Sequence, residues 1–247
     1  MTEKPDVEQI LALQRRWDRI RIANLYDALD KMGYFNQCLD LGIRPLFPHQ
    51  HLAGVAVTVR GARDPVDYHA LQAQQKAAAS AAAAADAKPQ PSSDVRSHLF
   101  PGAVVVVDGG GEMLTGKFGE MTSWRCKQAG AKGIVLDGFI RDRLGLEVIP
   151  DYCVCARGTS PIESARRWRI HAVNVTIAMP GTLTSQVTVR PGDWVIGGPD
   201  GVIVVPQEIA DEVLVRAEEI EEREEGMRRD LAAGMSFDDA FKKWGRA

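Results

Sequence analysis

The sequence predicts an α/β fold from three observations in its central third. Four valines, Val104 to Val107, lead into Asp108 and three glycines, which is the pattern of a buried strand that runs into a loop. Phe118 to Ala129 then repeats apolar and long side chains at helical spacing, with a glycine directly after it. A second short buried strand, Ile134 to Leu136, ends at Asp137 and a glycine. Two strands joined in this way bring two loops to one edge of a sheet, where open α/β sheets bind ligands.

Length and composition favour one domain, residues 1–247, with a sizeable core. The chain has 247 residues, is 45% hydrophobic and carries a net charge of −3, so neither nucleic acid nor an anionic membrane is expected as a partner. The charged N-terminus precedes no apolar stretch, and no window reaches the roughly 18 apolar residues of a membrane span. Four cysteines are too few for a disulfide scaffold and indicate a reducing, cytoplasmic compartment.

The first third predicts two helices, a strand and an unusual insertion. Amphipathic periodicity over Val7 to Trp17 and Ile20 to Met32 predicts N-terminal helices within residues 6–32, and Leu52 to Val59 alternates as a strand does. Asn24, Asp27 and Asp30 on the second helix fit a solvated face at least as well as a catalytic one. Tyr68 to Asp86 is alanine-rich and helical in composition, and Lys88 to Val95 predicts a surface loop because its prolines cannot continue a helix.

The last third predicts strands followed by C-terminal helices within residues 207–244. The expected strands are Tyr152 to Cys155, Ile170 to Ile177, Gln186 to Val189, Trp194 to Ile196 and Val202 to Val205. A long helix from Gln207 to about Leu231 has an apolar stripe of Ile209, Val213, Ala217 and Ile220. Ser236 caps a last helix, which we expect to be anchored by Phe237, Phe241 and Trp244.

Two short motifs invite functional assignments that the residues do not support. Gly111 to Lys117 has the GxxxxGK spacing of a phosphate-binding loop, but Phe118 stands where Ser or Thr must bind magnesium. Cys153 and Cys155 share one face of a strand, and two thiols without further ligands make a weak zinc site. We interpret these two cysteines as buried structural thiols.

The two loops together predict a site for a 2-oxo acid. The helix that begins near Phe118 presents unpaired amides at residues 119–122 to an anion, and Gly119 allows close approach. Arg141 offers a planar fork for a carboxylate, and Asp142 offers hard oxygen ligands for Mg²⁺ or Mn²⁺. The alternative is that Arg141 and Asp142 only form surface ion pairs. Their position after a buried strand, opposite a glycine-rich loop, favours the ligand site.

These segments resemble the family of RraA-like proteins. The shared motifs are VVVDGGG at 105–111, GE at 119–120, GIVLDGFIRD at 133–142, ARGTSP at 156–161, VxPGD at 189–193 and DGVIVVP at 200–206. The family contains class II 4-hydroxy-4-methyl-2-oxoglutarate and 4-carboxy-4-hydroxy-2-oxoadipate aldolases, the regulator of ribonuclease E activity, and members with an older demethylmenaquinone methyltransferase label. The resemblance implies a swivelling α/β/β sandwich, here with extra N- and C-terminal helices around a core at about 23–206, assembled as a trimer or hexamer with the site between subunits.

The resemblance also implies roles for individual residues. Asp142 is the metal ligand, and Arg141 meets the substrate carboxylate. The backbone amides of Met121 and Thr122 bind that carboxylate beside Gly119, and Glu120 orients a metal-bound water.

Three departures from the family pattern put the substrate in doubt more than the chemistry. The segment from about Ala70 to Ser97 is a longer insertion than is usual there. Lys117 brings a charge into the glycine loop, and the turn at 197–200 keeps one acidic residue, Asp200. We expect the insertion and Lys117 to reshape the pocket beside the far end of the substrate.

We therefore expect a metal-dependent retro-aldol lyase that releases pyruvate from a 4-hydroxy-2-oxo acid, with oxaloacetate decarboxylation as a side activity. Arg141 and the metal stabilise the enolate, and a base, acting through a water held by Glu120, removes the C4 hydroxyl proton. A Schiff-base route has only Lys117, Lys127 and Lys132 as candidates, and each is more simply an exposed charge. The alternatives are a non-catalytic regulator that binds a ribonuclease, and a metal-dependent hydratase or decarboxylase of another oxo acid.

Assembly is the last expectation. Six carboxylates lie within eight residues, Glu218 to Glu225, and repel one another unless cations or a partner lie nearby. We expect a homo-trimer or homo-hexamer in which a neighbouring chain closes the pocket.

Overall fold

The computed structural model describes residues 6–64 and 94–245. The alanine-rich helix predicted at 68–86, and the loop after it up to residue 93, lie outside the described residues. Within the described ranges, none of the helices combines the length and the apolar character that crossing a membrane requires.

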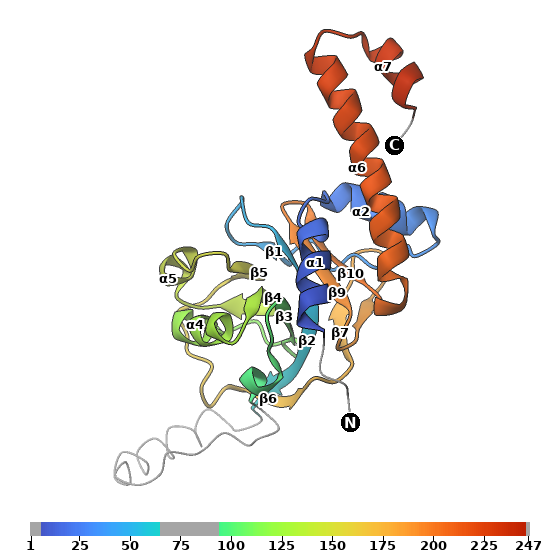
Figure 1. Cartoon of the computed structure of the whole chain (residues 1–247). Helices are drawn as coiled ribbons and strands as arrows, with labels where there is room; N and C mark the ends of the chain where they lie inside the picture. Colours follow the sequence, from blue (N-terminus) through green and yellow to red (C-terminus); the bar gives the residue numbers. More distant parts are fainter. Residues whose placement is uncertain (1–5, 65–93, 246–247) are drawn as a thin grey trace, which may run out of the picture.

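One large mixed sheet organises the chain (Figure 1). Its order is β1 (Arg44–Pro45), β5 (Cys153–Thr159), β4 (Ala131–Ile140), β3 (Ala103–Asp108), β2 (Leu52–Arg63), β9 (Trp194–Gly198) and β10 (Gly201–Val205), and β6 (Trp168–Val173) also pairs with β2. The four strands β2, β3, β4 and β5 are parallel, so their carboxyl ends meet at one edge. This confirms the α/β class.

β4 continues past the end that the sequence predicted. Instead of stopping at Asp137, it remains paired with β5 through Phe139 and Ile140, after a register shift that follows Leu136. Gly138, with φ of 150°, makes this irregularity possible because residues with a side chain rarely adopt such a backbone angle. The strand therefore delivers Arg141 and Asp142 directly from its end.

The two faces of the sheet are covered by different layers. Val105 and Val107 face a core shared with helices α4 (Glu120–Gln128) and α5 (Arg143–Glu147), which lie together on one side of the molecule in Figure 1. Val104 and Val106 face the opposite core, which includes the two-stranded sheet of β7 (Ile177–Pro180) and β8 (Gln186–Val189). The architecture is the α/β/β sandwich.

The region predicted as a single strand, Ile170 to Ile177, is two strands. β6 ends at Val173, β7 begins at Ile177, and Asn174 between them has a left-handed φ of 58°. An asparagine tolerates that conformation better than the β-branched residues around it, so the chain turns there and leaves the main sheet.

The N- and C-terminal helices pack together over β9 and β10. α1 (Val7–Trp17) has the predicted bounds and is capped by Asp6, whereas α2 (Ile22–Lys31) begins two residues late because a tight turn precedes it. α6 (Ala210–Ala232), entered through the 3-10 turn η3 (Gln207–Ile209), buries the predicted stripe at Val213, Ala217 and Ile220. Trp17 and Trp194, with ring centroids 6.0 Å apart, lie in this core.

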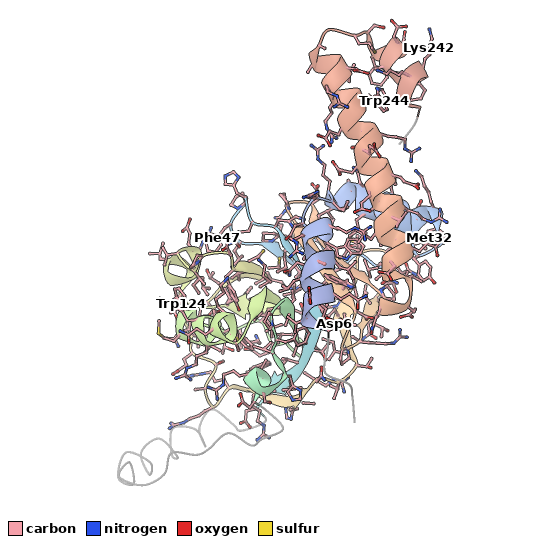
Figure 2. The ribbon with its side chains drawn as sticks, viewed as in Figure 1. Asp6, Met32, Phe47, Trp124, Lys242 and Trp244 are labelled. Atoms are coloured by element: carbon pink, nitrogen blue, oxygen red, sulfur yellow. The ribbon has the colours of Figure 1, made fainter. Side chains whose placement is uncertain are left out.

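The outer part of α6 leaves the body of the molecule and carries α7 (Phe237–Trp244) (Figures 1 and 2). Trp244 packs over Gly226 and donates its Nε1–H to Asp230 Oδ2 at 2.7 Å. The predicted cap Ser236 is confirmed, and so is Trp244 as an anchor. The prediction was wrong for Phe237 and Phe241, which are 62% and 45% exposed and stack on each other.

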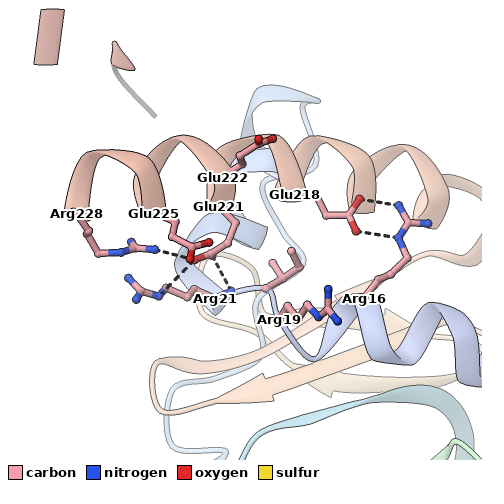
Figure 3. Close-up of a pocket in the computed structure, with 9 residues that line it drawn as sticks. Arg16, Arg19, Arg21, Glu218, Glu221, Glu222, Glu225 and Arg228 are labelled. Carbon is pink, nitrogen blue, oxygen red and sulfur yellow. Dashed lines mark hydrogen bonds and ion pairs between the residues drawn. The ribbon is translucent and has the colours of Figure 1, made fainter. Parts of the chain in front are cut away.

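Arginines of the same chain form ion pairs with part of the acidic face of α6 (Figure 3). Glu218 binds Arg16 at 2.6 Å, and Arg228 binds both Glu221 and Glu224 at 2.9 Å. Asn24 is buried and donates to Glu221 and Glu224, which settles its role as a structural contact. Arg16, Glu218, Glu221 and Arg228 are among the residues that line a crevice of about 690 Å³ between α6, the end of α1 and the turn before α2. The ion pairs supply within the chain part of the charge compensation for which a neighbouring chain was expected.

Candidate active site

The loop after β3, residues 109–118, runs between the ends of β4 and β5. Its backbone is fixed by bonds from the Gly116 amide to the Ile162 carbonyl and from the Lys117 amide to the Phe139 carbonyl, both at 2.9 Å. A Cβ on Gly116 would lie 2.5 Å from the Cβ of Arg141, closer than real side chains approach. The glycine therefore lets the loop lie directly against the segment that carries Arg141.

Within this loop, Lys117 and Glu112 form a buried ion pair. Lys117 Nζ lies 2.6 Å from Glu112 Oε2, and the two side chains are 0% and 3% exposed. Burial raises the pKa of Glu112, but hydrogen bonds from Lys117 and Thr115 outweigh it and hold this pKa below its ordinary value. The lysine is committed to the protein interior, which is the physical reason that the GxxxxGK spacing does not make a phosphate site.

The helix after the loop has the predicted cluster of amides at its N-terminus. α4 begins at Glu120 with Gly119 as its N-cap, two residues later than the sequence indicated. The Glu120 amide donates to Asp142 Oδ2 at 3.3 Å, whereas the Met121 and Thr122 amides have no acceptor within the described part of the chain. This helix terminus and the residues after β4 therefore meet in space.

Asp142 is held in a left-handed conformation, with φ of 63° and ψ of 46°, as the N-cap of α5. Gly119 makes room for it, because a Cβ at that position would overlap Asp142 Oδ2. The glycine that was expected to admit a ligand thus also admits the Asp142 carboxylate.

Arg141 lies next to Asp142 and is one-third exposed. Its Nε is 3.4 Å from Asp142 Oδ1 and its Nη1 is 3.8 Å from Glu163 Oε1. Such long, partly exposed ion pairs hold a side chain weakly, so the guanidinium can exchange them for a bound carboxylate. Sequence reasoning missed Glu163, which follows β5 and reaches the same sheet edge.

Two further residues that sequence reasoning missed stabilise the ends of these strands. Arg157 donates to Asp137 Oδ1 and to Asp40 Oδ1, both at 2.6 Å. Burial raises the pKa of Asp40, but the Gly42 amide and Arg157 outweigh it and lower this pKa overall. Asp137 is therefore engaged by Arg157, and Asp142 is the more accessible aspartate of the DGFIRD segment.

Residues 22–204 match the model of the RraA-like family, described as Aldolase/RraA. The chain belongs to the RraA-like family. A Halalkalibacterium halodurans relative with the provisional name of 4-hydroxy-4-methyl-2-oxoglutarate aldolase is 31% identical over 132 residues, which are 53% of this chain and 60% of the relative. A relative of the same name from Pseudomonas aeruginosa is 37% identical over 108 residues, 43% of this chain and 61% of its own length. The chain thus spans about three-fifths of the curated relatives it matches.

Solved structures agree on the family fold. An uncharacterized protein from Pseudomonas syringae pv. tomato has a TM-score of 0.72 at 24% identity, with 93% of this chain and 96% of that chain covered. Streptomyces coelicolor RraAS2, described as an unusual member of the RNase ES inhibitor RraA protein family, has a TM-score of 0.69 at 27% identity, with coverage of 92% and 99%.

One departure from the RraA-like pattern has a different effect from the one expected. The ammonium group of Lys117 is buried with Glu112, so it is not exposed to a substrate. The other expected cause, the insertion from about Ala70 to Ser97, lies almost entirely outside the described residues.

The oxygen donors of this site would suit a magnesium-type ion better than zinc. No group of three histidine, cysteine or acidic residues comes together within residues 6–64 and 94–245, so the protein would supply few ligands. Mg²⁺ commonly binds one or two carboxylates and takes its other ligands from water and substrate, and the 44% exposed side chain of Asp142 suits that pattern.

Cys153 and Cys155 are buried with their sulfurs 3.8 Å apart. Their mutual hydrogen bond and burial raise the pKa of Cys155, which agrees with the interpretation of these two cysteines as structural thiols.

The three lysines are poor Schiff-base candidates. Lys117 is buried in its ion pair, so the expectation that it is exposed was wrong. Lys127 and Lys132 lie near the end of α4 and the start of β4, away from the carboxyl ends of the strands. Burial and the charge of Lys132 lower the pKa of Lys127, whose Nζ donates to the Asp151 carbonyl.

We predict that Gly119→Ala displaces the Asp142 carboxylate from the start of α4 without unfolding the protein. The φ of −90° at Gly119 suits alanine, so the effect comes from the overlap with Asp142. Loss of a hydrogen bond to a charged group, about 1.5 kcal/mol, should speed hydrogen exchange at the Glu120 amide roughly tenfold. Gln128→Ala, at the exposed far end of α4, is the control. Unchanged exchange at Glu120 would contradict the assignment.

Proposed function

We propose that the chain is a divalent-metal-dependent lyase that cleaves a 4-hydroxy-2-oxo acid by a retro-aldol reaction. The products are pyruvate and a second oxo compound, and oxaloacetate decarboxylation is a side activity because it passes through the same enolate. Family membership and the provisional aldolase names of the relatives support this proposal.

The observation that carries the proposal is the meeting of three groups at one sheet edge. The open amides begin α4, whereas Arg141 and Asp142 are neighbours at the end of β4, and the Glu120 amide lies 3.3 Å from Asp142 Oδ2. Arg141 Nε lies 3.4 Å from Asp142 Oδ1. Amides and a guanidinium bind carboxylates, and hard oxygens bind Mg²⁺ or Mn²⁺. A 2-oxo acid has the carboxylate and keto oxygens that suit both.

In this proposal the substrate carboxylate binds the Met121 and Thr122 amides and the fork of Arg141. The same guanidinium and the positive end of α4 stabilise the charge that develops on the keto oxygen as the C3–C4 bond breaks. Glu120, whose carboxylate lies against Gly145 of α5, orients the water that takes the C4 hydroxyl proton. Asp142 would hold the metal ion, which when bound supplies Lewis-acid polarisation of the oxo acid.

A ribonuclease regulator is the second candidate. Its support is the structural likeness to RraAS2, which extends over 92% of this chain at a TM-score of 0.69. A pure binding protein has no need of Arg141, Asp142 and open helix amides in one place, so we favour the lyase. A hydratase or decarboxylase of another oxo acid would use the same groups, and pyruvate release from a panel of 4-hydroxy-2-oxo acids and oxaloacetate separates it from the aldolase.

A homo-trimer or homo-hexamer is part of the proposal. Five exposed apolar side chains come from the loops and helices that carry the site: Leu114, Met121, Leu144, Val148 and Ile162. Exposed apolar side chains on the segments that form a site are candidates for contact with a partner. A neighbouring subunit that covers these five side chains would exclude water from the site. Arg141 stabilises developing charge more strongly when water is excluded.

Turnover should depend on a divalent ion held by Asp142. EDTA should reduce pyruvate release to background, Mg²⁺ or Mn²⁺ should restore it, and borohydride with substrate should leave the enzyme active. Asp142→Asn should lose Mn²⁺ binding in a titration while its melting temperature stays near the parent value, with Asp151→Asn as the control. Full activity in chelator would exclude the metal mechanism.

Arg141→Lys should lower kcat/KM by roughly 100-fold, because the variant keeps the charge but loses the planar fork, worth about 3 kcal/mol. Steady-state kinetics on the best substrate measure the loss, and Arg125→Lys on the exposed face of α4 is the matched control. Turnover of Arg141→Lys near the parent rate would show that the carboxylate binds elsewhere.

Light scattering at assay concentration should give three or six times the chain mass of 27.0 kDa. Leu144→Asp, at a side chain that is 81% exposed, should shift the protein towards monomer and reduce turnover together. A parent protein that is fully active as a monomer would refute a site closed by a neighbour.

A further inference from the structure

The buried ion pair in the glycine loop is the strongest feature that the proposed mechanism leaves unused. Lys117 Nζ contacts three oxygens: Glu112 Oε2 at 2.6 Å, the Glu112 carbonyl at 2.7 Å and the Thr115 carbonyl at 3.4 Å. It also lies 5.8 Å from the centre of the Trp168 ring, a cation–π contact. The ammonium group therefore links Glu112 and Thr115, on the earlier part of the loop, to Lys117.

The Glu112 carboxylate organises the other side of the same turn. It accepts hydrogen bonds from the Leu114 amide at 3.0 Å, the Thr115 amide at 3.1 Å and the Thr115 hydroxyl at 2.9 Å. Nearly every polar atom of the pair thus has a partner inside residues 112–117. The two side chains fix the backbone of this segment in one conformation.

Stability alone does not account for the pair. Taking two charges out of water is costly, and replacing a buried ion pair by apolar residues of similar size often leaves the stability of a protein unchanged or raises it. The location offers another reason. Lys117 stands two residues before the N-cap Gly119, and its own amide is bonded to the Phe139 carbonyl of β4, two residues before Arg141.

We propose that Glu112 and Lys117 are positioning residues for the active site. The pair holds the loop so that the Gly119–Thr122 amides face Arg141 and Asp142, and Trp168 supports it by donating its Nε1–H to the Gly109 carbonyl at 3.0 Å. Neither residue touches the substrate. The kinetic part of this inference rests on the proposed function.

The test uses a variant that removes both charges while keeping the shape. In Glu112→Gln with Lys117→Met, the Gln oxygen still accepts from the Leu114 and Thr115 amides and the Met side chain fills the space of the lysine stem. Because no unpaired charge stays buried, we expect the double variant to fold and to melt within a few degrees of the parent. Lys117→Met alone, which leaves Glu112 unpaired, should melt at a lower temperature.

Two readouts then separate positioning from stability. Hydrogen exchange of residues 116–122 should be at least tenfold faster in the double variant, with β3 and β4 unchanged, and kcat should fall at least tenfold. Lys127→Met, at the other end of α4, is the control and should change neither. A folded double variant with parent exchange and parent kcat would overturn the positioning role. If the parent releases pyruvate from no oxo acid, the proposed function fails, while the exchange readout still decides whether the pair fixes the loop.

Discussion

The close approach of the loop after β3 to the ends of β4 and β5 is the constraint on which the site depends. At Gly109 an added Cβ would overlap the Asp137 carbonyl, at Gly116 it would overlap Arg141, and at Gly119 it would overlap Asp142. Three glycines thus bring backbone within contact of the segment that carries the charged groups. The buried Glu112–Lys117 pair then fixes the conformation that these glycines permit, and α4 begins where the loop leaves off.

The parts of this arrangement that the sequence predicted are those set by local pattern. The valine run gave β3 its bounds, periodicity gave α1 and α6, and strand-end position marked Arg141 and Asp142 as neighbours of the α4 amides. The structure places both residues beside the start of α4. The catalytic roles of Arg141, Asp142 and Glu120 stay predictions.

The parts that were missed depend on partners distant in sequence. The continuation of β4 beyond Gly138 needs β5 as its partner, and the Arg157 bridge joins Asp137 to Asp40, 117 residues before Arg157. The cations that relieve part of the acidic face of α6 were also missed for this reason, because Arg16 meets Glu218 across 202 residues. The sequence of a charged helix shows which like charges lie close together, but only the fold shows which cations from other segments pair with them.

The geometry also explains why an arginine and an aspartate stand side by side. Asp142 already places a negative charge at the positive end of α4, at the amides where a substrate carboxylate would bind. Two carboxylates at one helix terminus repel each other, and the partial charge of about half a unit at that terminus cannot offset both. On the proposed chemistry, Arg141 and a divalent ion on Asp142 are the two positive charges that offset the repulsion between Asp142 and the substrate carboxylate. On that proposal, the adjacency of Arg141 and Asp142 matches the charge of the substrate, and the loop and its glycines bring those charged groups close together.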